Sequence, residues 1–121
     1  MPQKSGGGNN MLTIEFRGKQ IEVDDNGHIV DSDEWSKELA EHIAIMEGID
    51  MTDAHWEVVY LLRDYYEKYH IAPMIKILVK KMLNVMGPEK GNVKYLYGLF
   101  PGGPAKQACK IAGLPKPTGC V

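Results

Sequence analysis

Helix-breaking residues divide most of this chain into short helical segments. Pro73, the pair Gly87-Pro88 and the run Pro101-Gly102-Gly103 separate stretches whose apolar residues recur every three or four positions. Proline cannot continue a helix interior, because it lacks an amide hydrogen and its ring clashes with the preceding turn. Apolar residues at this spacing are typical of helices that bury one face. The chain is therefore expected to fold as several short helices packed around one core.

The apolar spacing predicts where these helices lie and which residues face inward. The first helix is expected to begin at a Ser32 or Asp33 cap and to end before Gly48, and the second to begin after Thr52. A third is expected over residues 74–85, followed by a short fourth helix. The expected inward residues are Trp35, Leu39, Ile43 and Met46 in the first helix; Ala54, Val58, Leu61, Leu62, Tyr65 and Tyr69 in the second; Ile75, Leu78, Val79 and Met82 in the third; and Val93, Leu96, Tyr97 and Phe100 in the fourth.

Two short segments near the N-terminus alternate apolar and polar residues. They are residues 12–16 and 21–23, and Arg17-Gly18-Lys19 lies between them. Alternation with a period of two around a glycine-containing turn predicts a β-hairpin. A lone hairpin is only marginally stable in water, so it has to pack against the helices. The expected fold class is mainly α (α+β): a small helical bundle with an N-terminal β-hairpin and a flexible C-terminal arm.

Composition along the chain predicts how it is divided. A chain of 121 residues is long enough for one domain with a single core. Residues 1–10 are polar and rich in glycine, which predicts a disordered N-terminal extension. Residues 11–112 are expected to form the hairpin and bundle domain, and residues 113–121 a mobile C-terminal arm.

No segment has the features of a membrane span or a signal peptide. No apolar run approaches the roughly 20 residues that a membrane helix needs, and the N-terminus lacks an apolar signal region. We therefore expect a cytoplasmic protein, a compartment in which thiols are mostly kept reduced. In such a protein the chain's two cysteines are expected to be redox-active rather than structural.

Both cysteines lie close to the C-terminus. Cys109 falls near the middle of a last helix expected to start at Pro104, and Cys120 is the penultimate residue. Their separation differs from the C-x-x-C spacing of thioredoxin-type sites and from the spacing of zinc-ligand pairs. With Gly113 and Gly119 as pivots, the two thiols can meet in a disulfide. Stretched out, the same segment reaches about 35 Å.

A thiol on such a tether can enter a narrow cleft in another protein and then return to its partner thiol. The thiolate is the reactive form, and Lys110 and Lys116 are expected to lower the pKa of nearby thiols. We therefore expect Cys109 and Cys120 to be the reactive residues of the protein. An inert tail thiol is the alternative interpretation.

The four histidines do not form a recognisable metal site. His28, His42, His55 and His70 are scattered without the spacing of metal ligands, and each is expected to be a cap, surface or core-edge residue. His55 lies where a capping box would place Glu or Gln after Thr52. No metal is expected to bind this chain.

Charge is distributed unevenly along the chain. Residues 1–69 carry 6 Lys/Arg and 15 Asp/Glu, whereas residues 70–121 carry 8 Lys and a single acidic residue, Glu89. The helix expected over residues 74–85 is basic and follows another helix after a short break, as in a helix-turn-helix. A DNA-binding regulator is therefore an alternative function. The first helix of that pair is acidic, however, which disfavours contact with phosphates.

Several motifs from Thr52 onward form a recognisable set. They are Pro104-Ala105-Lys106-Gln107-Ala108-Cys109, the segment Ile111 to Val121, Lys94-Tyr95-Leu96-Tyr97 with Leu99-Phe100-Pro101, Thr52, His55-Trp56, and Leu62-Arg63-Asp64-Tyr65-Tyr66. Together they resemble the motifs of the DsrC/TusE family. The C-terminal motif is highly specific, and the resemblance extends over everything from about Leu12 onward. Family members have an N-terminal β-hairpin on a helical bundle, in agreement with the fold expected above.

The resemblance implies a role in sulfur transfer. In the family the penultimate cysteine is general, while the upstream one distinguishes two branches. TusE-like members keep only the last cysteine and relay persulfide sulfur toward tRNA thiolation; DsrC-like members have both and serve dissimilatory sulfur metabolism. Because this chain has Cys109 and Cys120, it resembles the DsrC branch, the gamma subunit-like partner of dissimilatory sulfite reductase. A TusE-like relay is the alternative.

For a DsrC-like protein the resemblance implies a sulfur-carrying co-substrate without turnover of its own. The arm would insert into sulfite reductase, where Cys120 takes up sulfur and then joins Cys109 in a disulfide or trisulfide. This chain would bind no cofactor, while sirohaem and iron–sulfur clusters would belong to the partner enzyme. A membrane-linked reductase or persulfide-transfer proteins would be further partners, nucleic acid would not, and the free protein would be a monomer. The direction of sulfur flow stays open.

Overall fold

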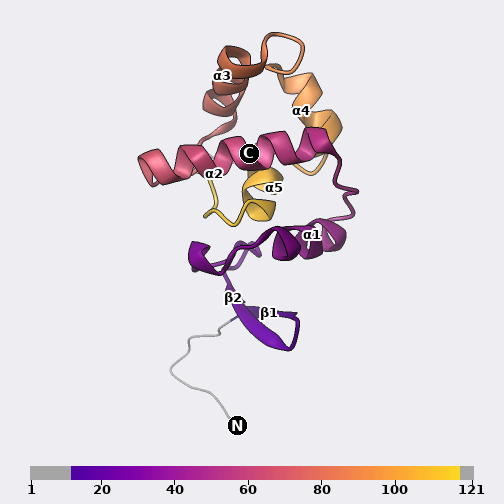
Figure 1. Ribbon diagram of the computed structural model, residues 1–121, viewed down its shortest axis with the longest axis vertical. Helices are drawn as coiled ribbons and strands as arrows, with labels where there is room; N and C mark the ends of the chain where they lie inside the picture. Colours follow the sequence, from indigo (N-terminus) through magenta and orange to yellow (C-terminus); the bar gives the residue numbers. More distant parts are fainter. Residues whose placement is uncertain (1–11, 118–121) are drawn as a thin grey trace.

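Two strands, a short 3-10 helix and five α-helices follow one another in the computed structural model, which describes residues 12–117 (Figure 1). The hairpin lies at one end of the molecule, and α3 and α4 lie at the other. The expected class, mainly α with an N-terminal β-hairpin, is confirmed. The extension expected over residues 1–10 lies outside the described residues. The elements are β1 (Leu12–Phe16), β2 (Lys19–Val23), the 3-10 helix η1 (Ser32–Glu34), α1 (Lys37–Met46), α2 (Asp53–Tyr69), α3 (Ile75–Met86), α4 (Val93–Leu99) and α5 (Pro104–Ile111).

Helix α5 occupies the centre of the fold. It contacts α1, α2, α3 and α4, which surround it (Figure 1). Ala105, Ala108, Cys109 and Ile111 are fully buried on this helix. Two alanines among them allow neighbouring helices to approach closely, because a methyl group adds little bulk. The C-terminal helix is therefore the core element around which earlier parts of the chain pack.

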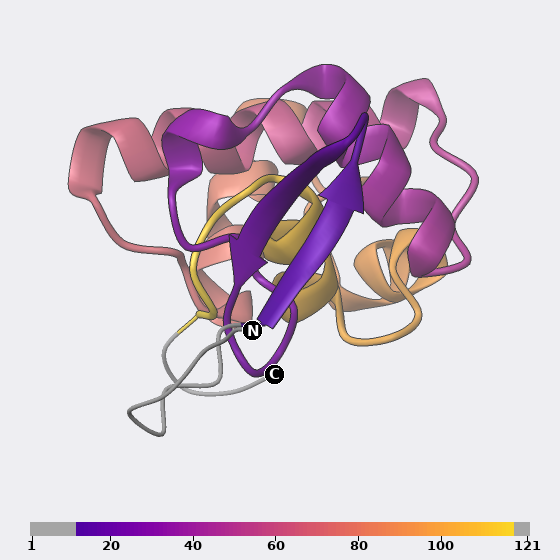
Figure 2. The ribbon, with the colours of Figure 1, turned by 90° about the horizontal axis from the view of Figure 1, so that it is seen from below.

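The hairpin forms with a two-residue turn. Phe16 pairs with Lys19, so the loop consists of Arg17 and Gly18 alone. Both have positive φ angles, 53° and 79°, as a type I′ turn requires. The two strands lie side by side in front of the helices in the view from below (Figure 2). The later strand buries Ile21 and Val23, and the earlier strand packs the partly buried Ile14 and Phe16 against the same core.

The first helix begins later than the sequence predicted. Instead of starting at a Ser32 or Asp33 cap, α1 starts at Lys37, where Ser36 Oγ accepts the amide hydrogen of Leu39 at 3.0 Å. The earlier cap signal produces the separate helix η1, whose N-cap residue is Asp31. Trp35 lies between the two helices and has an extended backbone, with ψ at 142°. It therefore divides the single helix that the sequence pattern predicted.

Helix α2 starts after Thr52, as predicted, and its cap uses an unusual partner. His55 Nδ1 accepts from the Thr52 amide at 3.1 Å and lies 2.8 Å from the Thr52 hydroxyl. Because Nδ1 is an acceptor, Nε2 carries the hydrogen and donates it to the Leu99 carbonyl at 2.8 Å. His55 thus takes the place of the Glu or Gln of a capping box. Its second hydrogen bond connects the start of α2 to the end of α4.

Several residues expected to face inward are exposed. Met46, Tyr69, Val93 and Tyr97 are 43–52% exposed. On α2 the buried face runs through His55, Val58, Val59 and Leu62 and does not continue to Tyr69. Helix α4 is so short that it buries only Leu96. No helix within residues 12–117 is both long and apolar enough to cross a membrane.

The central position of α5 predicts that it tolerates little added volume. Ala108→Leu should lower the free energy of unfolding by about 2 kcal/mol, because extra methylene groups in a filled core force neighbours to move. Urea unfolding at equilibrium measures this change. Lys106→Leu, on the same helix but only partly buried, is the matched control and should have a much smaller effect. Equal stability of the two variants would show that α5 is not tightly packed.

Candidate functional site

Cys109 lies in the last turn of α5, rather than near the middle of the helix as the sequence suggested. Its side chain is fully buried in the hydrophobic core. Burial removes the stabilising water that a thiolate needs, and this raises the pKa of the Cys109 thiol to about 12. In this conformation Cys109 is a protonated, unreactive thiol at neutral pH.

The expectation that a neighbouring lysine activates Cys109 is wrong. The Lys110 ammonium is 3.0 Å from Glu47 Oε2, so it forms an ion pair with a carboxylate at the end of α1. Desolvation is the cause of the shift in the Cys109 pKa, and it acts in the opposite direction to a nearby cation. Lys116 is exposed.

Cys120 lies outside the described residues. The structure therefore neither brings it together with Cys109 nor separates the two. Their assignment as the reactive pair stays a prediction. The described residues do show how the chain leaves α5 on its way to Cys120.

The end of α5 is a Schellman cap. Leu114 N–H donates to the carbonyl of Cys109 at 2.9 Å, and Gly113 N–H donates to the carbonyl of Lys110 at 3.2 Å. Gly113 has the positive φ, 74°, that this cap requires, and a Cβ at this position would collide with the Trp35 ring. Gly113 therefore ends the helix and has no room to act as an open pivot. Gly113, Leu114 and Pro117 are buried, so three of the five described residues of the expected arm pack on the domain. A mobile arm starting at residue 113 stays a prediction.

Three side chains donate hydrogen bonds to carbonyls at this cap. Trp35 Nε1 donates to Ile111 at 2.8 Å, Arg63 Nη1 donates to Ala112 at 2.7 Å, and His28 Nδ1 donates to Leu114 at 2.9 Å. We call Trp35, Arg63 and His28 the cap clamp. They come from three separate parts of the fold. Trp35 and Arg63 satisfy carbonyls that the helix end leaves free, and His28 binds the carbonyl of Leu114 just beyond the cap.

Arg63 also stabilises the cap electrostatically. Its guanidinium lies 4.0 Å from the centre of the Trp35 ring, which places a cation over an aromatic face. A positive charge at a helix C-terminus is favourable because the carbonyls there carry partial negative charge. Partial burial lowers the pKa of Arg63, while Glu67 and Asp33 act against that shift.

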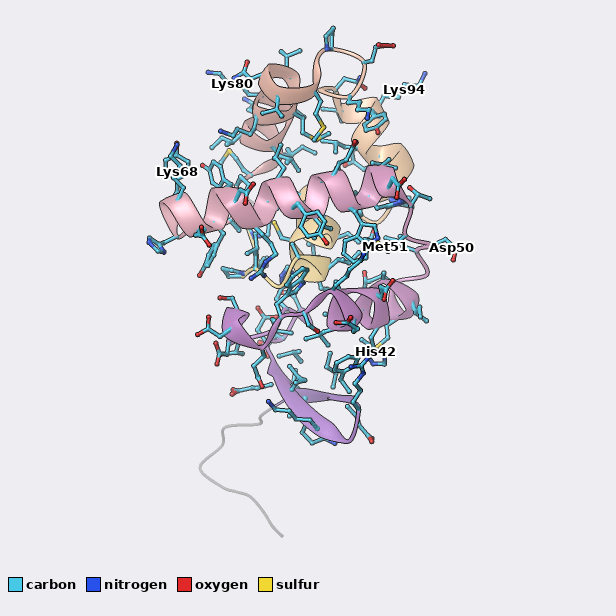
Figure 3. All side chains as sticks on the ribbon, viewed as in Figure 1. His42, Asp50, Met51, Lys68, Lys80 and Lys94 are labelled. Atoms are coloured by element: carbon cyan, nitrogen blue, oxygen red, sulfur yellow. The ribbon has the colours of Figure 1, made fainter. Side chains whose placement is uncertain are left out.

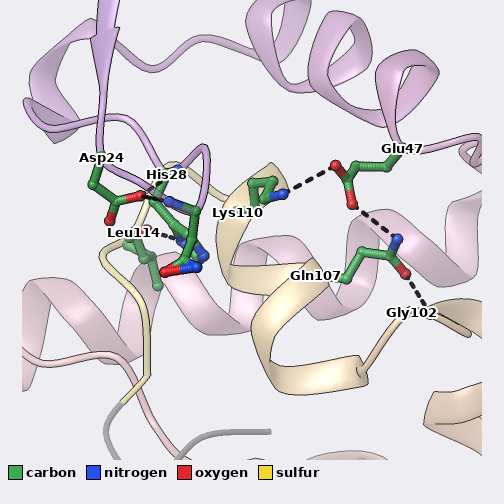
Figure 4. Close-up of polar contacts among 8 residues, drawn as sticks. Asp24, His28, Glu47, Gly102, Gln107, Lys110 and Leu114 are labelled. Atoms are coloured by element: carbon green, nitrogen blue, oxygen red, sulfur yellow. Dashed lines mark hydrogen bonds and ion pairs between the residues drawn. The ribbon is translucent and has the colours of Figure 1, made fainter. Parts of the chain in front are cut away.

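His28 is buried and has one ring nitrogen without a partner. Its backbone is fixed by Asp24, whose Oδ1 accepts the His28 amide hydrogen at 3.0 Å and whose own N–H donates to the His28 carbonyl at 2.8 Å (Figure 4). Because a carbonyl can only accept, Nδ1 carries the hydrogen that binds Leu114. Nε2 has no partner among the described residues. Burial lowers the pKa of His28, which favours the neutral ring.

A second polar network also holds α5. Glu47 accepts from Gln107 Nε2 at 3.0 Å and pairs with Lys110, while Gln107 Oε1 accepts the Gly102 amide at 3.0 Å (Figure 4). Burial opposes ionisation of Glu47, but the hydrogen bonds from Gln107 and Lys110 outweigh it and lower its pKa. The network joins the end of α1, α5 and the turn before α5.

The surroundings of the cap are open on one side. A groove of about 440 Å³ borders Leu114, and its lining includes Trp35, Arg63, Tyr66 and His70. Basic side chains gather at a different place, since Lys80 and Lys94 point outward at the end of the molecule formed by α3 and α4 (Figure 3). Within residues 12–117 no three His, Cys, Asp or Glu side chains gather in a way that could hold a metal ion.

Comparison with known proteins places this site in a family. The family model described as "DsrC like protein" matches residues 15–121, which is most of the chain. This chain belongs to the DsrC-like family. The match includes the segment after residue 117 that the structure does not describe.

DsrC-like relatives include proteins named as sulfurtransferases. "Sulfurtransferase TusE" of Escherichia coli strain K12 is 55% identical over 106 residues, covering 88% of this chain and 97% of that protein. The "Sulfurtransferase TusE homolog" of Haemophilus influenzae is 48% identical over 108 residues, covering 89% and 99%. The expected membership of the DsrC/TusE family is therefore confirmed.

A solved DsrC-like structure has the same fold. The NMR structure of Allochromatium vinosum DsrC has a TM-score of 0.82 and 49% identity, and it covers 93% of this chain and 100% of its own. The relatives named above thus include both TusE and DsrC proteins, so family membership by itself does not select one branch.

The titration of His28 gives the cap a predictable pH dependence. Its pKa is lower in the folded protein than the ordinary 6.5, so the unfolded chain binds more protons as the pH falls below that value. The free energy of unfolding should therefore be highest above about pH 6.5 and decrease as the pH falls toward the folded pKa. Urea unfolding across this range measures the decrease.

Two variants isolate the contribution of His28. His28→Gln keeps an amide donor for Leu114 but does not titrate, so its stability should depend less on pH than that of the parent protein. His28→Phe removes both the donor and the titration, and it should be less stable at every pH. An unchanged pH dependence in both variants would contradict this account.

Proposed function

We propose that this protein is a sulfur carrier that holds a sulfur atom on Cys120 and uses Cys109 as its second thiol. Membership of the DsrC-like family carries this proposal, and the sulfurtransferase names of close relatives support it. The chain is a partner in reactions catalysed elsewhere and has no turnover of its own. It works as a monomer in the cytoplasm.

The position of the cap suits such a carrier. Leu114 is anchored next to Cys109, and the chain then continues for six residues to Cys120. Six extended residue steps span about 20 Å. Cys120 can therefore reach a reactive centre inside another protein and can also return to the end of α5.

Loading requires only a persulfide donor and a thiolate on Cys120. The Cys120 thiolate attacks the outer sulfur of the donor persulfide, and the sulfur–sulfur bond of the donor breaks. The donor leaves as a thiolate and takes up the proton that the Cys120 thiol released. The product is a persulfide on Cys120. Atoms and electrons balance without an added oxidant, and the buried Cys109 takes no part in this step.

The sulfur on Cys120 has two candidate destinations, and a persulfide relay is the better supported of them. Relatives named TusE are 48–55% identical to this chain over nearly their whole length. A relay of this kind would pass sulfur from one persulfide-transfer protein to the next, toward the thiolation of tRNA. Cys120 alone would suffice for it.

The presence of Cys109 favours a second destination, dissimilatory sulfite reductase. A solved relative is titled the oxidised gamma subunit of that enzyme from Archaeoglobus fulgidus and is 44% identical to this chain. Sulfur at the sulfoxylate oxidation level could condense with the thiols of Cys109 and Cys120 to form a trisulfide, releasing two waters. Sirohaem and iron–sulfur clusters would belong to the enzyme, and a membrane-linked reductase would return the thiols.

Single-cysteine variants test the carrier role. Cys120→Ser should fail to gain sulfur from a persulfide donor, whereas Cys109→Ser should load as fully as the parent protein. Intact-mass spectrometry counts the added sulfur atoms. Equal loading of Cys120→Ser and the parent protein would sink the proposal, and circular dichroism of both variants verifies that they are folded.

The same variants separate the two destinations. With sulfite and the reductase, the intact chain should form an internal trisulfide only if the second destination applies, and Cys109→Ser should not form it. With a persulfide-accepting partner, the relay predicts equal transfer from the parent protein and from Cys109→Ser. Transfer that is lost in Cys109→Ser would contradict the relay.

A further inference from the structure

The burial of Cys109 creates a problem for any reaction that uses it. A thiol that is fully buried cannot meet an incoming sulfur atom or lose its proton to water. The last turn of α5 therefore has to open before Cys109 can react. The contacts that hold this turn include the Schellman cap, the burial of Leu114, the cap clamp and the ion pair of Lys110 with Glu47.

We propose that Trp35, Arg63 and His28 are positioning residues that gate Cys109. While they hold the carbonyls of residues 111, 112 and 114, the thiol stays shielded; when they release these carbonyls, the last turn of α5 opens and Cys109 becomes available. The consequence for sulfur chemistry rests on the function proposed above. The opening itself does not depend on it.

The geometry favours a local opening over unfolding of the whole domain. The three clamp bonds all end on residues 111–114, and Leu114 N–H binds the Cys109 carbonyl directly. Releasing this one segment breaks every bond just named. Glu47 binds Gln107 before the last turn and Lys110 within it. Release of residues 111–114 breaks neither of these two bonds, so they can hold the rest of the helix in place. The groove beside Leu114 leaves room for the released segment.

The gate determines when a loaded sulfur is discharged. After opening, the Cys109 thiol loses its proton and attacks the inner sulfur of the Cys120 persulfide. A disulfide between Cys109 and Cys120 forms, the bond between the two persulfide sulfurs breaks, and hydrosulfide leaves with the proton as hydrogen sulfide. This step needs no outside oxidant. A closed gate preserves the persulfide for transfer to a partner.

Labelling of Cys109 tests the gate without any sulfur chemistry. In the Cys120→Ser background, Cys109 is the only thiol, and its rate of alkylation by iodoacetamide reports how often the turn opens. Trp35→Phe removes one hydrogen bond but keeps an aromatic ring under Arg63, and it should raise the labelling rate about fivefold. Arg63→Met is a second variant that should act in the same direction.

Trp56→Phe is the matched control. Trp56 is a partly buried indole that packs against the same core, and it donates no hydrogen bond to residues 109–114. Its variant should change the labelling rate only as far as it changes overall stability. Low concentrations of urea separate the two routes, because a local opening exposes little surface and its rate stays nearly constant, whereas global unfolding accelerates steeply.

Two outcomes would overturn the gate. In one, labelling follows the urea dependence of global unfolding in every variant. In the other, Trp35→Phe and Trp56→Phe label at equal rates once their stabilities are matched. Neither outcome bears on whether Cys120 carries sulfur, since that thiol is absent from these proteins.

A final measurement links the gate to discharge. In the chain with both cysteines, loaded with persulfide, Trp35→Phe should release hydrogen sulfide about fivefold faster while its rate of loading stays unchanged. Faster labelling without faster release would overturn the role in discharge. A chain that takes up no sulfur at all would instead overturn the proposed function, and the labelling result would still decide the gate.

Discussion

The cap at the end of α5 is the constraint on which the rest of this structure depends. One short helix contacts four others, and its final carbonyls bind side chains from the loop after the hairpin, from the segment before α1 and from α2. The hydrogen bonds connect residues 49, 76 and 86 positions apart in sequence. The N-terminal half of the chain can therefore reach its final arrangement only when the C-terminal helix is in place.

This arrangement reconciles two conflicting demands on Cys109. A thiol that has to react needs water and a low pKa, whereas a residue in the central helix of a small domain has to be buried for the core to be stable. Burial prevails in the closed structure, and the pKa of about 12 is its consequence. The role proposed for Cys109 as a second thiol therefore requires motion of the last turn. A cap built from a few identifiable hydrogen bonds is a suitable place for that motion, since each bond contributes only about 1 kcal/mol.

Charged side chains surround the cap and also gather at the other end of the molecule. Glu67 and Asp33 act on Arg63 at the cap, and Lys106 and Lys110 act on His28. Further lysines, among them Lys80 and Lys94, point outward at the end formed by α3 and α4 (Figure 3). Long-range attraction can orient such a molecule toward an oppositely charged partner before contact.

The sequence by itself determined the hairpin, most of the helices, the family and the positions of the two cysteines. Proline and glycine interrupt helices by local geometry, and the hairpin alternation and the Thr52 cap are equally local, so these features could be predicted from neighbouring residues alone. Only the tertiary structure decided which helix is central, which side of α2 is buried, and that Gly113 closes a cap. It also decided the state of Cys109, which the adjacent Lys110 had suggested would be activated. No sequence signal marked His28 or Trp35 as partners of the α5 carbonyls, because the burial of a thiol and the direction of a hydrogen bond depend on residues brought together from distant parts of the chain.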